Sequence, residues 1–278
     1  MKSKRLNFFV AAVLVFILYS CAEKQEGCLD VYATNFEFEA DKVCEDCCTY
    51  PVFELAVSHY WDSLETFSYS DPVFEQQDST DTIWINQLGF FISDIRFHTE
   101  TDSLGMFSLV EVPNTFGDDL LLESSIRWIN QKDPSGKDLG ILQQRGEIIN
   151  SVSFWIGFNP IYGVPDASNL PISNPVSYET DSLNFSEDYG LLYAYLNYKI
   201  TGSLPKDSTG IELLNANYVK LGLDLDTKLE VGEDVSLDLR LYYSKLFEGC
   251  SLLLSNSEQI RICIEDNFTN SFEVISLN

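Results

Sequence analysis

The sequence predicts an all-β fold, an antiparallel sandwich or barrel that follows a small disulfide-rich module. Many short runs of alternating apolar and polar residues are separated by turn signals, as in half-buried strands. Aromatic residues make up 13% of the 278 residues, and together with many Ile, Val and Thr residues they favour strands. These runs do not alternate with long amphipathic helices, which argues against a parallel α/β sheet.

The first 20 residues have the pattern of a secretory signal. Basic residues precede the apolar run Phe8–Tyr19, which is shorter than the roughly 20 residues that span a bilayer. A signal peptide is therefore predicted over residues 1–20. Leu18-Tyr19-Ser20 followed by Cys21 resembles a bacterial lipoprotein signal, which implies lipidation of Cys21 and attachment to a membrane through acyl chains. The alternative is a plain signal peptide with a chance cysteine after it.

The mature chain is expected to have three parts. These are a lipidated tether over residues 21–27, a Cys-rich module over 28–51 and a β domain over 52–278. The tether is short and polar, so it is expected to be flexible. The anchor predicts an outer-membrane lipoprotein of the cell envelope that faces the periplasm or the cell surface.

The charge of the chain excludes one class of partner. The full sequence has a net charge of −26, with 17 basic and 43 acidic residues. Removing the signal removes three of the basic residues and leaves 14 against 43, a net charge of −29. Such a charge repels phosphate backbones, so no nucleic-acid partner is expected. A solvated acidic surface on an exported protein is the plainer interpretation.

The cysteines predict disulfides. Lipidation of one of the seven cysteines leaves an even number in an exported chain. The cysteines left are Cys28, Cys44, Cys47, Cys48, Cys250 and Cys263. Cys250 and Cys263 flank a short segment and are predicted to pair with each other. The other four allow three pairings, and their spacing, with no histidine nearby, does not match a zinc finger.

The N-terminal module resembles small GC-x-D-x-x-A-x-N-[FY]…A-[DN]…C-x-Y modules of exported Bacteroidetes proteins. The matching pieces occur in order, at Gly27-Cys28-Leu29-Asp30, Ala33-Thr34-Asn35-Phe36, Ala40-Asp41 and Cys48-Thr49-Tyr50-Pro51. About 24 residues bury too little apolar surface to fold unaided, so cross-links are expected to hold the module together.

Strands are predicted along most of the rest of the chain. They cover Val52–His59, Thr82–Leu88 leading into Gly89–His98, Phe107–Val112, Gly146–Phe158, Leu191–Leu204, Tyr218–Leu225, Val235–Leu241, Ile260–Ile264 and Phe272–Leu277. Alternation places Phe91, Ile95 and Phe97 on one face. Leu120–Ile129 fits either a helix or a strand, and Asn159–Tyr189 is predicted to be a long loop.

The order of several strand motifs resembles the MbnP-like domain, over roughly residues 52–255. The pieces are Leu55–Tyr60, Gly89–Phe97, Ser153–Phe158, Leu192–Ile200 and Leu223–Phe247 with Leu246–Gly249. This β domain of exported proteins is named for the periplasmic partner of the copper chelator methanobactin. The resemblance implies an envelope binding protein, with copper or a copper carrier as its ligand.

Two departures from the family pattern bear on copper. Leu192, Ala194 and Leu196 replace the family's Met and both Trp residues. His59 and His98 are the only histidines of the chain, and copper favours imidazole and sulfur ligands. His59 is the first candidate metal ligand and His98 the second. The alternative for each is a histidine that binds no metal.

No catalytic motif stands out, and no enzyme is expected. A Gly-x-Ser-x-Gly sequence, a phosphate loop and a dinucleotide fingerprint are all absent from the sequence. Acidic pairs such as Asp224 and Asp226 arise by chance in so acidic a chain. Two functions therefore remain: a binding protein for copper or a copper carrier, or a metal-free structural or interaction lipoprotein. In the second, Tyr60, Trp61 and the 159–189 loop are expected to contact an envelope partner.

Overall fold

The structure is a computed structural model of the whole chain. It describes residues 24–69, 74–75, 82–106, 109–114, 117–123, 125–131, 137–142, 146–162, 170, 174–177, 184–186, 188, 190–201, 206–251 and 256–278. The predicted signal peptide, Cys21 and much of the predicted 159–189 loop lie outside these residues.

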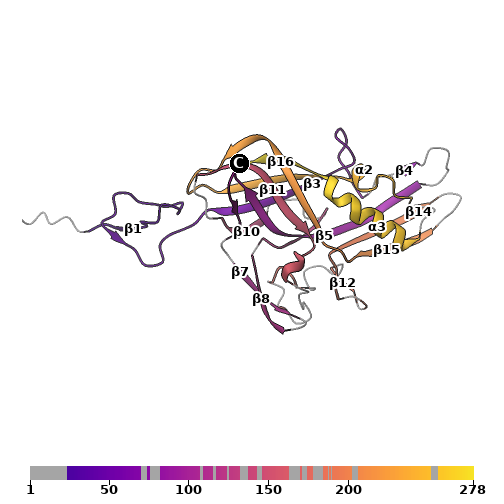
Figure 1. Cartoon of the computed structure of the whole chain (residues 1–278), viewed down its shortest axis with the longest axis horizontal. Helices are drawn as coiled ribbons and strands as arrows, with labels where there is room; N and C mark the ends of the chain where they lie inside the picture. Colours follow the sequence, from indigo (N-terminus) through magenta and orange to yellow (C-terminus); the bar gives the residue numbers. More distant parts are fainter. Residues whose placement is uncertain are drawn as a thin grey trace, which may run out of the picture.

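Two sheets carry the fold, as Figure 1 shows. The larger has the order β15-β14-β5-β11-β16, with β4, β6 and β9 also paired to β5, and the smaller has the order β10-β3-β17-β18. Their strands are β3 (Val52–Tyr60), β4 (Phe74–Glu75), β5 (Thr82–His98), β6 (Ser103–Leu104), β9 (Arg127–Asn130), β10 (Lys137–Ile141), β11 (Ile148–Ile156), β14 (Ala194–Thr201), β15 (Lys206–Leu213), β16 (Asn217–Lys228), β17 (Val235–Tyr242) and β18 (Phe272–Leu277).

The all-β, antiparallel prediction is confirmed, with one exception inside the sandwich. Within the two main sheets the pairs are antiparallel, but β17 runs parallel to β3, with Val235 opposite Phe53 and Tyr242 opposite Tyr60. Parallel neighbours need a long connection between them. All strands of the larger sheet lie between β3 and β17 in the sequence. Local sequence patterns therefore do not reveal that β3 and β17 pair.

Smaller elements complete the described chain. They are β1 (Glu26–Gly27), β2 (Lys42–Val43), β7 (Leu109–Asn114), β8 (Gly117–Glu123), η1 (Pro160–Tyr162), β12 (Phe185–Ser186), β13 (Gly190–Leu191), α2 (Tyr243–Leu246), α3 (Ser257–Asn267) and η3 (Phe268–Asn270). The ambiguous segment 120–129 is extended, since it forms part of β8 and most of β9.

The core lies between the two sheets and follows the alternation of the strands. Phe53, Leu55 and Val57 of β3 are buried, and the ring of Phe53 meets that of Phe97 edge-on at 5.3 Å between centroids. β17 contributes four further buried side chains, those of Val235, Leu237, Leu239 and Leu241. Burial of side chains of this size stabilises the fold by about 1.5–3 kcal/mol each.

A bulge at Asp94 corrects the predicted facing of β5. Asp94 has a φ of 51°, and the pairing of β5 with β11 shifts register between Ser153 and Trp155. A bulge adds one residue and so reverses the alternation. Phe91 therefore does not share the face of Ile95 and Phe97. It packs in a second cluster with Trp128 and Phe158, outside the main core.

The predicted strand Ile260–Ile264 was wrong, because this segment is the middle of helix α3. Asn256 caps the helix by accepting a hydrogen bond from the backbone N–H of Gln259, whose side chain accepts one from the N–H of Asn256. Such a capping box starts a helix. Ile260 and Ile264 then lie one turn apart and are both buried, so a short apolar run fits either structure.

The disulfides join the cysteines in three pairs: Cys28 with Cys48, Cys44 with Cys47, and Cys250 with Cys263. The last pair ties the segment after α2 to helix α3, which is the pairing that the sequence predicts. The first two lie within the N-terminal module.

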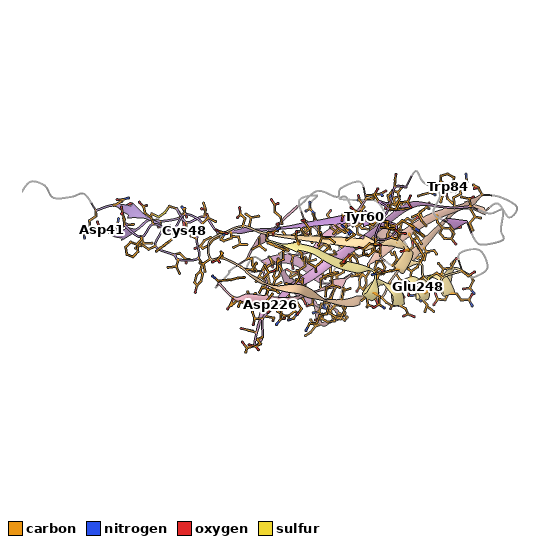
Figure 2. The ribbon with its side chains drawn as sticks, turned by 90° about the horizontal axis from the view of Figure 1, so that it is seen from above. Asp41, Cys48, Tyr60, Trp84, Asp226 and Glu248 are labelled. Carbon is orange, nitrogen blue, oxygen red and sulfur yellow. A yellow bond between two sulfur atoms is a disulfide. The ribbon has the colours of Figure 1, made fainter. Side chains whose placement is uncertain are left out.

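The module extends from one end of the sandwich (Figure 1). It touches the turn between β16 and β17, where a Cβ atom on Gly232 would lie 3.0 Å from the carbonyl oxygen of Ala33. In Figure 2, Cys48 lies at this end, whereas Tyr60, Trp84 and Glu248 lie toward the other. Among the described residues, no helix has the length and apolar character needed to cross a membrane.

Candidate functional site at His59 and the surface above it

The predicted ligand His59 lies inside the sandwich, near the end of β3 that is farther from the module. Its side chain is 6% exposed, and its Nδ1 atom lies 3.0 Å from the hydroxyl oxygen of Tyr243, the first residue of α2. Tyr243 in turn hydrogen bonds with Tyr69. The hydroxyl of Tyr69 accepts a hydrogen bond from the N–H of Leu88 at 2.7 Å and donates one to its carbonyl at 2.8 Å.

The two nitrogens of the imidazole ring differ in their partners. Nδ1 is paired with the hydroxyl of Tyr243. Nε2 is buried without a hydrogen-bond partner.

Burial governs the charge of this network. It lowers the pKa of His59 to about 4, because the low-polarity surroundings disfavour the imidazolium. It also raises the pKa of Tyr243 well above its ordinary value, with Tyr69 as a smaller cause. At neutral pH both side chains are therefore uncharged, as buried polar groups without counter-charges should be.

The second candidate ligand, His98, ends β5 in the larger sheet. Its Nε2 atom lies 2.7 Å from the Oγ atom of Ser153 on β11. Loss of hydration lowers the pKa of His98, and the cations Lys220 and Arg96 lower it further. This ring is partly exposed and has a hydrogen-bond partner, unlike the Nε2 atom of His59.

The structure does not bring the two histidines together. Phe97, the neighbour of His98, packs on Phe53, and His59 lies six residues farther along the same strand as Phe53. At about 3.3 Å per residue, this separates the two histidines by roughly 20 Å. No cluster of three or more His, Cys, Asp or Glu suited to a metal occurs in the described part of the chain. The two histidines thus do not fit a single copper centre.

A patch of aromatic and charged side chains lies on the outer face of the smaller sheet, beside His59. The guanidinium of Arg240 lies 4.1 Å from the ring centroid of Tyr60 and 5.9 Å from that of Tyr242. The ammonium of Lys245 lies 4.7 Å from the Tyr242 ring. The Tyr242 hydroxyl accepts a hydrogen bond from Arg240 at 3.2 Å and donates one to Glu273. We call these five residues the Tyr60–Arg240 surface.

Sequence reasoning found only part of this surface. Tyr60 and Trp61 were expected at a contact surface, and Tyr60 is half-buried within it, while Trp61 is partly buried against the core. Alternation along β17 places Arg240 on the wet face of the sheet. Its position beside Tyr60 depends on the parallel pairing of β3 with β17, for which the sequence has no local signal.

No protein-family model and no curated protein sequence matches this chain. Among solved structures, it is similar to MbnP from Methylosinus trichosporium, over 72% of this chain and 78% of that chain, with 7% sequence identity and a TM-score of 0.41. MbnP is the protein for which the family suggested by the strand motifs is named. A likeness of this size carries no conclusion about ligand or activity.

Proposed function

We propose that this chain is a lipid-anchored binding protein of the cell envelope, which holds a partner protein at the Tyr60–Arg240 surface. The observation that carries the proposal is the guanidinium of Arg240 lying 4.1 Å above the Tyr60 ring on an outward sheet face. Tyr and Arg are the residue types over-represented among the side chains that dominate binding energy at interfaces. Three disulfides favour an oxidising compartment.

The position of the surface supports this role. Cys21 precedes the module at one end of the sandwich, whereas Tyr60 lies toward the other end in Figure 2. An anchor at Cys21 would therefore hold the Tyr60–Arg240 surface away from the membrane. Two cations, Arg240 and Lys245, lie in this patch of a strongly acidic chain. A partner with carboxylate and aromatic side chains complements it.

Cross-linking in the native envelope tests the proposal. The full chain is expressed with an affinity tag, cross-linked and purified, and co-purified proteins are identified by mass spectrometry. We expect one envelope protein to be recovered with the wild type and lost with the double variant Tyr60→Ala, Arg240→Ala. Lys199→Ala, an exposed site on the other sheet, serves as the control. Equal recovery with all three chains would contradict the proposal.

Copper binding is the second candidate, and one observation favours it. Metal-binding imidazoles hold their other ring nitrogen in a hydrogen bond to a fixed partner. The Nδ1 atom of His59 lies 3.0 Å from the Tyr243 hydroxyl, and its buried Nε2 atom has no hydrogen-bond partner. The resemblance to the MbnP-like domain implies the same metal. His98 lies too far away to share it, so further ligands would have to come from elsewhere.

Elemental analysis of the protein purified from its native envelope tests this candidate. A copper centre at His59 predicts stoichiometric copper, and a melting temperature that rises with Cu(I) in the wild type but not in His59→Gln. His98→Gln should retain the response. If the protein binds no copper at micromolar concentrations of added metal, the copper candidate is contradicted and the metal-free binding function remains.

A further inference from the structure

A cleft lies where helix α3 crosses the edge of the larger sheet formed by β14 and β15. It has a volume of about 470 Å³, within the range of small-molecule sites. Its lining includes Tyr195, Gly210, Glu212, Ser257, Glu258 and Arg261. The cleft is separate from the Tyr60–Arg240 surface, which lies on the other sheet.

The lining includes an aromatic ring that packs against a glycine. A Cβ atom on Gly210 would lie 2.5 Å from the hydroxyl oxygen of Tyr195 and 3.2 Å from its Cε2 atom. An alanine at position 210 would therefore have to displace the end of the Tyr195 ring, which packs against the backbone of β15. Asn197 donates a hydrogen bond to the Tyr195 hydroxyl at 3.4 Å. Tyr195 and Gly210 both line the cleft.

Helix α3 adds a set of paired charges to the lining. Arg261 donates to Glu258 at 3.0 Å and to both carboxylate oxygens of Glu265 at 3.0 and 2.9 Å. Glu265 is buried, and it also accepts hydrogen bonds from the backbone N–H groups of Leu214 and Asn215 at 3.1 and 3.2 Å. The guanidinium is therefore held in place by groups that do not depend on a ligand.

The balance of charge selects the kind of ligand. Arg261 is already paired with two carboxylates, and Glu212 adds another acid, so the lining opposes a phosphate or sulfate group. A wholly apolar ligand would displace water from Glu212, Glu258 and Ser257 without replacing its hydrogen bonds. A neutral ring with hydroxyls at its rim and an apolar face satisfies both conditions. Its face can stack on Tyr195 while its hydroxyls bond to Glu212, Glu258 and Ser257.

We propose that this cleft binds a neutral carbohydrate, with one sugar ring stacked on Tyr195. Carboxylates paired with a guanidinium suit hydroxyl groups, because a carboxylate accepts the proton of a sugar hydroxyl while a guanidinium N–H donates to its oxygen. This role is independent of the partner binding proposed above, and either can fail without the other.

The test is isothermal titration of the complete mature chain, in detergent, with the neutral disaccharides cellobiose, maltose, N,N′-diacetylchitobiose and mannobiose. Sodium sulfate and spermine are the anionic and cationic comparisons. We expect at least one disaccharide to bind, and Tyr195→Ala to weaken that binding about tenfold or more, as loss of an aromatic anchor does. Gly210→Ala should weaken it also, because the new methyl group displaces the ring. Melting temperatures verify that the variants fold.

Tyr218→Ala is the matched control, since Tyr218 is an exposed tyrosine of the same sheet at 44% exposure. It should bind the disaccharide as the wild type does. The proposal is overturned if none of the four disaccharides binds, if Tyr195→Ala binds as tightly as the wild type, or if only sulfate or spermine binds.

Discussion

The Nδ1 atom of His59 lies 3.0 Å from the hydroxyl oxygen of Tyr243 at a depth where the surrounding side chains are apolar. This contact joins β3 to helix α2, and Tyr69 extends it to the backbone of β5. One polar chain thus links both sheets. Protonation of His59 would place a positive charge in these apolar surroundings.

The stability of the protein should fall as the pH drops from 6.5 toward 4. The pKa of His59 is lowered from 6.5 to about 4. Between these two pH values the imidazole is protonated in the unfolded chain but not in the folded chain. The free energy of unfolding then declines by about 1.4 kcal/mol per pH unit, to a total of about 3 kcal/mol. Urea unfolding of the wild type between pH 7 and 5, where most carboxylates stay ionised, measures this decline.

His59→Gln should lose most of that pH dependence, and His98→Gln should keep it. The pKa of His98 is also lowered, but its ring is partly exposed. If the slope in His59→Gln equals that of the wild type, the histidine is not buried as described.

Tyr243→Phe should destabilise the fold by about 1–3 kcal/mol, because it leaves the Nδ1 atom of His59 buried without a hydrogen-bond partner. Chemical denaturation monitored by circular dichroism measures the change. Tyr60→Phe, on the half-buried outer face, should change the free energy of unfolding by less than about 0.5 kcal/mol. A Tyr243→Phe protein as stable as Tyr60→Phe would argue against the hydrogen-bonded network.

Gly89→Ala should be costly, whereas Gly222→Ala should not. A Cβ atom at position 89 would overlap the indole of Trp128, while at position 222 it would meet no heavy atom within 4 Å. Overpacking of this kind costs about 1–3 kcal/mol, and an alanine that fits a strand is neutral or slightly stabilising. Melting curves of the two variants compare them directly, and equal melting temperatures would refute the packing of Trp128 on Gly89.

Removal of the Cys250–Cys263 disulfide, by Cys250→Ala with Cys263→Ala, should lower the free energy of unfolding by about 3 kcal/mol. The bridge closes a segment with a sequence separation of 13, and a loop of that order restricts the unfolded chain by about this amount. Denaturation in non-reducing buffer measures the loss. A peptide map in which Cys250 is joined to residues 28–48 would contradict the pairing itself.

Cys21→Ala should release the protein from the membrane, if the predicted lipid anchor exists. Acyl chains on Cys21 would supply the attachment, and alanine cannot carry them. Fractionation of cells that express each form, with mass spectrometry of the N-terminal peptide, decides the matter. A wild-type N-terminus without fatty acid would leave the anchor unsupported.

Alternation alone was enough to predict most strands of the sandwich. Two predicted strands, Val52–His59 and Val235–Leu241, end within one residue of the ends of β3 and β17. Each of these strands buries one face and exposes the other to solvent, which gives a clear alternation. The prediction was wrong at Ile260–Ile264, where a capping box and an i, i+4 apolar pair form a helix. It was wrong again at Phe91, where the bulge at Asp94 reverses the alternation.

The candidate site, too, could be predicted only in part from the sequence. Residue chemistry singled out His59 and His98 as the only imidazoles, and export with paired cysteines followed from the N-terminal pattern and the cysteine count. These properties are local, since they depend on residue type and on neighbours in the chain. The roughly 20 Å between the histidines, the placing of Arg240 over Tyr60 and the seating of Tyr195 on Gly210 depend on strand pairing. Pairing joins residues far apart in sequence, and its register is set by the packing of the whole core, so only the tertiary structure decided them.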